Sequence, residues 1–109
     1  MPQFDVHRNK GALRDSIPFV VVVQSAQFDR YRRRVVVPLV RRSALPAQTP
    51  SAGTRMNPIF CVENVDVVLH PLDLVSVAME QLGEHVGSLA EQGQAIADAL
   101  DELLTRSWG

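Results

Sequence analysis

Short runs of aromatic and β-branched residues, separated by turn-forming residues, most constrain what this chain can fold into. The run at 19–23 indicates a strand buried on both faces, and the stretch 33–39 centres on three consecutive valines. Pro38 cannot donate a backbone hydrogen bond, so we expect this second strand to lie at a sheet edge or to bulge. Further strands are expected over residues 3–7, 59–62, 65–69 and 74–78, with Glu63-Asn64 as a minimal hairpin turn.

One amphipathic helix is expected at the C-terminal end of the chain. Ser88 and Glu91 have the spacing of a capping box, whose side-chain oxygens accept from backbone N–H groups at a helix start. We expect the helix to begin at Ser88, to end near Arg106 and to tolerate Gly93 at a cost of about 1 kcal/mol. Its apolar face consists of Leu89, Ile96, Leu100, Leu103 and Leu104. A helix on a small, barrel-like antiparallel sheet predicts an α+β fold, as a single domain over residues 1–109.

The composition fits one cytoplasmic domain. A length of 109 residues is typical of a single domain, and 46% hydrophobic residues exclude a disordered chain. Cys61 is the single cysteine, which we interpret as a buried core residue. The N-terminus lacks a signal-peptide layout and the apolar runs are too short to span a bilayer, so we expect a cytoplasmic protein without membrane contact. The proline-rich segment 45–58 is expected to be a mobile loop.

The charges are segregated along the chain. Residues 1–62 carry ten basic and three acidic side chains, whereas residues 63–109 carry one basic and nine acidic side chains. Six of the basic residues lie between Arg30 and Arg42. This asymmetry indicates two electrostatic faces that can steer a charged partner, or strand-edge arginines that prevent aggregation. Tyr31, among four arginines, adds one ingredient of a nucleic-acid-binding surface.

The common sequence signatures of catalysis and metal binding are missing. The chain lacks a phosphate-binding glycine loop, an HExxH or CxxC pair and a nucleophile elbow. His7, His70 and His85 are scattered, and none has a metal-ligand neighbour at helical spacing. Asp98 and Asp101 lie on the expected exposed helix face, where a solvated acidic surface is the ordinary interpretation. We therefore expect no metal and no cofactor, and nothing in the residues points to nucleophilic catalysis.

Five parts of the chain together resemble the CcdB-type toxins of bacterial toxin–antitoxin modules. They are Gln3-Phe4-Asp5-Val6, segment 19–25, segment 33–39, segment 55–60 (Arg-Met-Asn-Pro-Ile-Phe), and Val86-Gly87-Ser88-Leu89 followed by Ala99-Leu100-Asp101. Their joint order and spacing over nearly the full length make the resemblance specific. It implies a small antiparallel, SH3-like barrel sheet with a side sheet and one C-terminal helix, assembled as a homodimer.

The same resemblance implies a function. A CcdB-type toxin binds the A subunit of DNA gyrase and traps its complex with cleaved DNA. A CcdA-like antitoxin neutralises the toxin with a disordered tail. The toxin–antitoxin complex represses its own operon, so operator DNA is a partner of that complex alone.

The resemblance also implies where gyrase would bind. The best-known family member ends in Trp-Gly-Ile, and Trp108 and Gly109 match the first two of these positions. Two such tails at a twofold axis would present paired indole rings, which can hold an arginine of the partner between them. The implied gyrase-binding residues are Asp101, Leu104, Ser107, Trp108 and Gly109, together with Gln27 and Phe28 from the loop after the second strand.

Three alternatives stay open at this stage. Trp108 is the only tryptophan, and it either packs on the chain's own surface or is held out for a partner. Related small-barrel toxins of the MazF type cleave RNA, and Arg33, Arg34 and His7 are the residues that could supply charge here. The third alternative is a non-toxic family member that keeps the fold and antitoxin binding.

Overall fold

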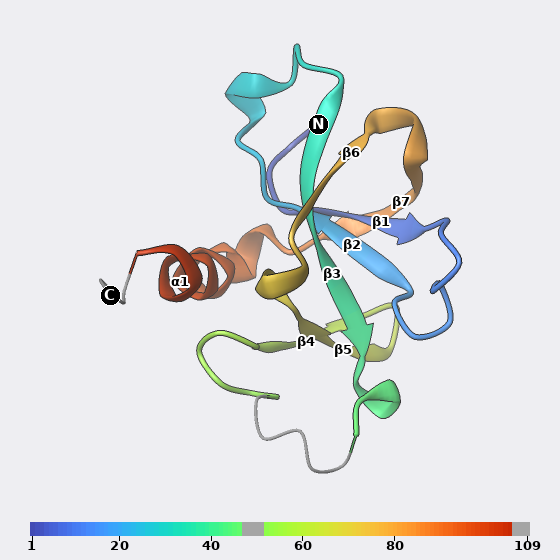
Figure 1. The fold of residues 1–109 in the computed structure, drawn as a ribbon, viewed down its shortest axis with the longest axis vertical. Coiled ribbons are helices and arrows are strands. Elements are labelled where there is room, and N and C mark those ends of the chain that lie inside the picture. Colours follow the sequence, from blue (N-terminus) through green and yellow to red (C-terminus); the bar gives the residue numbers. More distant parts are fainter. Residues whose placement is uncertain (47–51, 106–109) are drawn as a thin grey trace.

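The computed structural model describes residues 1–46 and 52–105 as a curled antiparallel sheet followed by a helix (Figure 1). The predicted site residues Ser107, Trp108 and Gly109 lie outside the described residues, as does the central part of the predicted loop, 47–51. The strands are β1 (Asp5–Asn9), β2 (Phe19–Val22), β3 (Arg33–Arg41), β4 (Ile59–Val62), β5 (Val65–Leu69), β6 (Val75–Ala78) and β7 (Leu82–Ser88), and the helix is α1 (Gly93–Leu104).

The strand order is β4-β5-β3-β2-β1-β7, and β6 forks from this order by pairing with the first part of β3. Neighbouring strands are antiparallel throughout the described sheet. The sheet curls into a half-barrel, and α1 lies to one side of it (Figure 1). The predicted α+β class with one C-terminal helix is confirmed.

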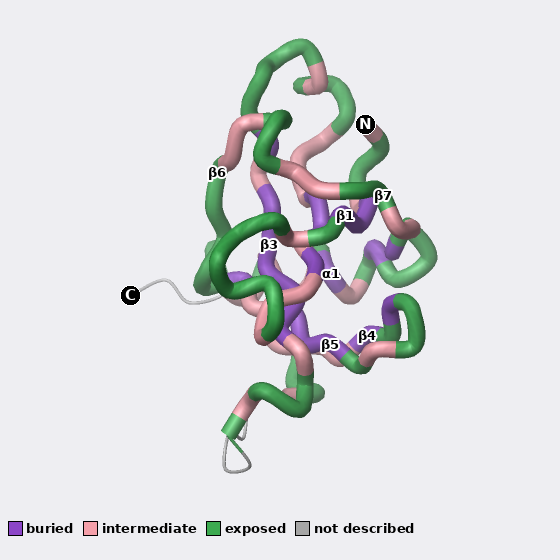
Figure 2. The backbone as a smooth tube through the Cα atoms, turned by 90° about the vertical axis from the view of Figure 1, so that its right-hand side faces the viewer, coloured by how far each residue is buried: buried purple, intermediate pink, exposed green. Residues whose placement is uncertain are grey.

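The core forms from the β-branched runs, as the sequence predicts. Val21, Val37 and Val67 are fully buried at the centres of β2, β3 and β5. Ile96 and Ala99 bring one face of α1 into the same cluster. Figure 2 shows buried backbone along β3 and β5, with exposed connections around it. Helix and sheet therefore share one hydrophobic core.

β3 lies at the centre of the sheet and pairs with β2 in continuous register through Pro38, so the prediction of an edge strand or a bulge there is wrong. One side of β3 pairs with β2. The other side pairs with β6 as far as Val36 and with β5 from Leu39 onward. Pro38 lies between these two partners, and its carbonyl accepts from the backbone N–H of His70 at 3.1 Å. Proline is tolerated because its missing donor falls where β3 changes partner.

The predicted hairpin between β4 and β5 is confirmed. Val62 pairs with Val65, which leaves a turn of Glu63 and Asn64. Both turn residues have positive φ angles, 48° and 64°. These angles match the tight hairpin turn whose twist fits the twist of the strands.

The helix begins at Gly93 rather than at Ser88. Ser88 ends β7 and pairs with Asp5 of β1, which keeps its backbone extended. Its Oγ accepts from the N–H of Ala90 at 3.1 Å, at the start of a 3-10 turn (Ala90–Gln92) that precedes α1. Gly93 is the first residue of the helix instead of an interruption within it. A larger residue would not fit there, because a Cβ would lie 2.7 Å from Cε2 of Phe4.

β7 is a strand that the sequence analysis missed. Its glycines and polar residues give no β-branched run, yet it pairs with β1 from Asp5↔Ser88 to Asn9↔Leu82. The approach is closest at Gly83, where a Cβ would lie 2.6 Å from the carbonyl oxygen of Arg8. The long-range partner, rather than local propensity, makes this segment a strand.

Cys61 is exposed, so its predicted core position is wrong. It lies in β4 between Phe60 and Val62, which are both buried. Successive side chains of a strand point to opposite faces, so a cysteine between two core residues faces outward.

Candidate interaction surface

The loop between β2 and β3 presents the predicted residues Gln27 and Phe28 to solvent. Both lie in a 3-10 turn (Ala26–Phe28), and Phe28 is 47% exposed. Gln24 ties this turn to β3, because its amide donates to the Phe28 carbonyl at 3.2 Å and accepts from the Val35 N–H at 3.1 Å. The two residues are therefore accessible on a loop whose base is fixed.

A buried arginine holds the rest of this loop. Arg34 is only 2% exposed, and its guanidinium donates to the carbonyl of Arg33 at 2.9 Å, to that of Asp29 at 2.8 Å and to that of Tyr31. The carboxylate of Asp29 lies 3.8 Å from the same guanidinium and also contacts the Met1 ammonium. One side chain thus fixes three successive parts of the loop, as the planar donor fork of arginine allows.

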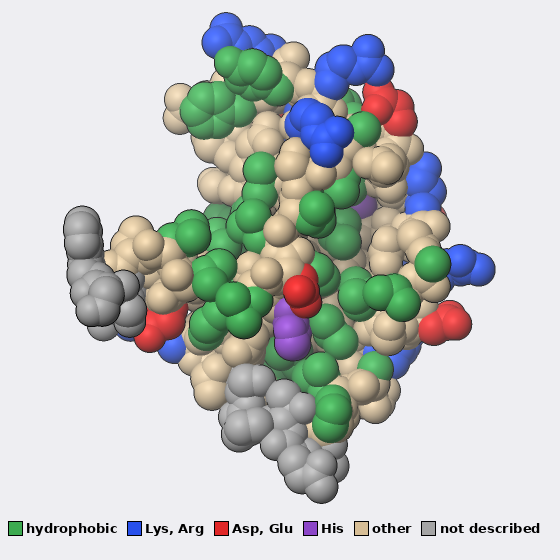
Figure 3. Space-filling model, viewed as in Figure 1, with side chains coloured by type: hydrophobic (Ala, Val, Ile, Leu, Met, Phe, Trp, Pro, Cys, Tyr) green, Lys and Arg blue, Asp and Glu red, His purple; other side chains and the backbone are tan. Residues whose placement is uncertain are grey.

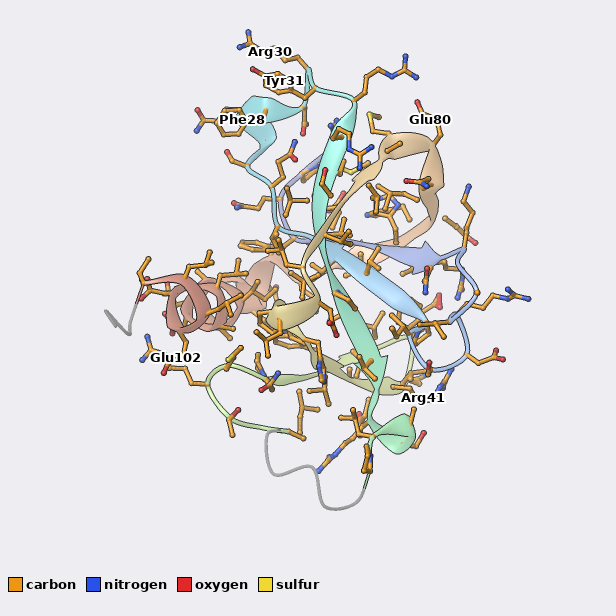
Figure 4. All side chains as sticks on the ribbon, in the orientation of Figure 1. Phe28, Arg30, Tyr31, Arg41, Glu80 and Glu102 are labelled. Atoms are coloured by element: carbon orange, nitrogen blue, oxygen red, sulfur yellow. The ribbon has the colours of Figure 1, made fainter. Side chains whose placement is uncertain are left out.

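The tip of the loop carries an exposed cluster that we call the aromatic–arginine knob, made of Phe28, Arg30, Tyr31 and Arg33. Tyr31 is 53% exposed, its ring centroid lies 6.3 Å from that of Phe28, and the Arg30 guanidinium lies 5.4 Å above the Tyr31 ring. Figure 4 shows Phe28, Arg30 and Tyr31 projecting together from this end of the molecule. In Figure 3 hydrophobic and basic side chains meet at the same end.

Arg32, next to the knob, is engaged by an acidic residue. Its guanidinium lies 2.6 Å from a carboxylate oxygen of Glu80, and both side chains are largely exposed. A backbone hydrogen bond at Glu80 first, and then the hydrogen bond and charge of Arg32, lower the pKa of the Glu80 carboxyl below its ordinary 4.5. The positive charge of Arg32 is therefore partly compensated.

The C-terminal end of α1 presents the other described residues of the predicted gyrase-binding set. Leu104 is 69% exposed, and Asp101 is exposed with its carbonyl accepting from the Thr105 N–H at 2.9 Å. Figure 4 places this end of α1, marked by Glu102, on the same side of the molecule as Phe28 but at a separate position. Within one chain the two parts of the predicted set form separate patches.

The acidic face of α1 is engaged by Arg55. Its guanidinium lies 3.7 Å from Asp98 and 3.4 Å from Glu102, so the arginine bridges two turns of the helix. Arg55 belongs to segment 52–58 of the predicted loop, where the Gly53 N–H donates to the Asn57 carbonyl at 2.8 Å. Asp98 is therefore part of an ion pair between loop and helix.

Two histidines that are far apart in the sequence meet between β1 and β7. His7 pairs with His85, with ring centroids 5.4 Å apart, and Nε2 of His85 lies 3.3 Å from Asp5. His7 is 7% exposed and its Nδ1 lies 3.0 Å from the carbonyl of Gly83, which can only accept. Among residues 1–46 and 52–105, no group of three or more His, Cys, Asp or Glu side chains could hold a metal ion. The sequence analysis could not place this pair because it missed β7.

The residues suggested for RNA cleavage do not form one exposed site. Arg34 and His7 are buried and hold structural hydrogen bonds, whereas Arg33 is exposed and bound to Ser76 of β6. Arg34 and His7 are therefore not accessible to a bound substrate. Arg33 is the one of the three that a substrate can reach.

The fold resembles those of solved toxin structures. An endoribonuclease in complex with its cognate antitoxin, from a mycobacterial species, is 14% identical with a TM-score of 0.73, covering 100% of this chain and 99% of that one. The Mycobacterium tuberculosis toxin MazF-mt6 is 16% identical with a TM-score of 0.70, covering 95% of this chain and 99% of that one. At these identities the likeness concerns the fold. No curated protein matches the chain.

The match of the sequence to a family model, rather than the fold, identifies the chain as a toxin of the toxin–antitoxin class. The family follows from the sequence. The chain belongs to the CcdB family, because the family model described as CcdB protein matches residues 3–106. Within the described residues, no helix is long and apolar enough to cross a membrane.

Proposed function

We propose that this toxin binds the A subunit of DNA gyrase and traps the enzyme's complex with cleaved DNA. Its membership of the CcdB family is the observation that carries the proposal. The exposure of Phe28 (47%) and Leu104 (69%) supports it, because large apolar side chains in solvent are typical anchors for a partner.

The gyrase-binding surface includes both parts of the predicted set, joined across a homodimer. Leu104 and Asp101 lie on one exposed helix end, and Gln27 and Phe28 lie on the tied loop. A twofold axis would bring two copies of each patch to one face. The remaining residues of the set are Ser107, Trp108 and Gly109.

A CcdA-like antitoxin neutralises the toxin, and the two together bind operator DNA in the cytoplasm. Several large apolar side chains outside the predicted gyrase-binding set are exposed, among them Leu13 (63%), Leu72 (74%) and Val75 (46%). Leu13 and Val75 line an apolar hollow of about 260 Å³ beside β6. A disordered antitoxin tail can cover such separate sites by wrapping the toxin. The solved endoribonuclease of similar fold is itself bound to an antitoxin.

A supercoiling assay tests the proposal. The purified full chain should inhibit DNA supercoiling by gyrase and leave cleaved DNA after detergent treatment. Phe28→Ala and Trp108→Ala should each remove inhibition, while Leu72→Ala, an exposed apolar residue outside the set, should not. Inhibition that survives both changes, in variants with unchanged circular dichroism spectra, would refute the assigned surface.

A second candidate function is RNA cleavage, which the similarity to the endoribonuclease and to MazF-mt6 favours. Arg33 could contact the RNA, whereas His7 and Arg34 are buried. Incubating the full chain with a defined RNA separates the two functions, because cleavage products would appear without gyrase. A third candidate, a non-toxic member that keeps antitoxin binding, is excluded if expression arrests bacterial growth.

A further inference from the structure

We propose that the aromatic–arginine knob is a binding site for single-stranded nucleic acid. Three residues of the knob (Phe28, Tyr31 and Arg33) line a shallow, open hollow of about 370 Å³ together with Gln24 and Val35, and the fourth, Arg30, lies over the Tyr31 ring. Single strands are bound where aromatic rings stack with bases and basic side chains contact phosphates. Both kinds of group converge at this hollow.

The rings are available for stacking. Phe28 and Tyr31 are about half exposed and are tilted by 39° to each other, so they offer two differently oriented apolar faces. The Arg30 guanidinium already lies over the Tyr31 ring, the arrangement in which arginine extends an aromatic platform. A base entering the hollow would therefore stack on the exposed ring area of Phe28 or Tyr31.

The charge at the hollow favours an anionic ligand. The hydrogen bonds of Arg33 go to neutral oxygens of Ser76, to Oγ at 3.1 Å and to the carbonyl at 2.6 Å, so its positive charge is not neutralised by them. Glu80 compensates Arg32, and Asp29 faces Arg34. Arg30 and Arg33 are thus the cations that phosphates would contact.

The platform is held in place before a ligand arrives. Arg34 binds the carbonyls of Asp29, Tyr31 and Arg33, and Gln24 clamps the turn that carries Phe28. A fixed surface loses less conformational entropy on binding than a free loop does. This fixed geometry distinguishes the knob from a merely solvated run of arginines.

The test measures binding of the full chain to fluorescein-labelled oligonucleotides of about ten nucleotides by fluorescence anisotropy. The arms are single-stranded RNA, single-stranded DNA, duplex DNA and a polyglutamate peptide as competitor. RNA integrity is checked on a gel after each titration. Saturable binding of either single strand, stronger than that of duplex and resistant to polyglutamate, supports the site. Comparing the RNA and DNA arms identifies the preferred strand.

Variants assign the binding to the knob. Tyr31→Leu keeps apolar area but removes the ring, so it should raise the Kd by about 5- to 150-fold, the range for loss of one stacked base. Tyr31→Phe should bind like the unaltered chain. Arg30→Gln should lower the salt slope of log K by about 0.7, the loss of one phosphate contact on a single strand. Arg14→Gln, a change at an exposed arginine outside the knob, is the matched control.

The proposal is overturned if neither single strand binds, if duplex DNA binds equally well or if polyglutamate competes at equal charge concentration. It is also overturned if Tyr31→Leu has no effect in a folded variant. If Tyr31→Leu unfolds, an unchanged salt slope of log K for Arg30→Gln overturns the proposal, and a slope lowered by about 0.7 supports it. Because Tyr31 and Arg30 are outside the proposed gyrase-binding set, failure here leaves the supercoiling result unaffected.

Discussion

Replacing Arg34 by methionine should destabilise the folded chain far more than replacing Arg32 by methionine. Both Arg34 and Arg32 have a carboxylate partner, but Arg34 is 2% exposed and the Arg32 side chain is 83% exposed. The exposed pair is held in water, where such contacts contribute little. The buried guanidinium donates to three backbone carbonyls.

The expected magnitude follows from what Arg34→Met leaves behind. Three carbonyl oxygens lose a charged donor, and Asp29 loses its guanidinium partner. Breaking a buried charged pair on one side costs about 3–5 kcal/mol. The Asp29 side chain is 30% exposed and can be rehydrated, so we expect the lower end, about 3 kcal/mol. That is a large part of the roughly 5–15 kcal/mol that stabilises a small domain.

Urea unfolding followed by far-ultraviolet circular dichroism measures the effect, at one protein concentration for all variants. Arg34→Met should lower the midpoint by about 1–3 M, from typical urea slopes. Arg32→Met should leave the urea midpoint unchanged. The midpoint of Arg34→Lys should lie between those of Arg34→Met and the unaltered chain, because lysine keeps the charge without the planar donor fork. Equal midpoints for Arg34→Met and Arg32→Met would refute the structural role of the buried arginine.

Three further predictions concern other elements. In β7, Gly83→Ala should cost about 1–3 kcal/mol, because its Cβ would lie 2.6 Å from a carbonyl oxygen of β1, whereas Gly87→Ala, with nothing within 4 Å, should not destabilise; urea midpoints compare the two. The pKa of Glu80, measured by NMR titration, should lie below 4.5, so its stabilising contribution is present at neutral pH and is lost as the pH falls through that pKa. Arg32→Met should raise this pKa without restoring 4.5, because the backbone hydrogen bond remains. Cys61 should react with a thiol reagent in the native protein as readily as in denaturant, and protection in the native state would contradict its exposed position.

The candidate surface could be predicted only in part. The resemblance pointed to Gln27, Phe28, Asp101 and Leu104, and all four are accessible in the structure. The sequence also showed Tyr31 among arginines, but it could not separate their roles. Arg33 and Arg34 are the same residue type in the same local sequence. Their exposure differs because successive side chains of β3 point to opposite faces of the sheet.

The meeting of His7 with His85 could not be predicted for a related reason. It depends on β7. The glycines and polar residues of β7 indicate a loop by local sequence, and only the pairing with β1 makes the segment a strand. The same pairing keeps Ser88 extended and moves the helix start to Gly93. Local signals such as a capping box are read correctly only when the long-range partner of the segment is known.

The sequence by itself determined the strands rich in β-branched residues, the Glu63-Asn64 turn and the single amphipathic helix, because each depends on residues within a few positions of one another. Tertiary structure decided the central position of β3, the existence of β7, the exposure of Cys61 and the burial of Arg34. These features depend on which distant strand supplies the neighbouring hydrogen bonds and which face of the sheet is covered, and neither property belongs to a local stretch of chain.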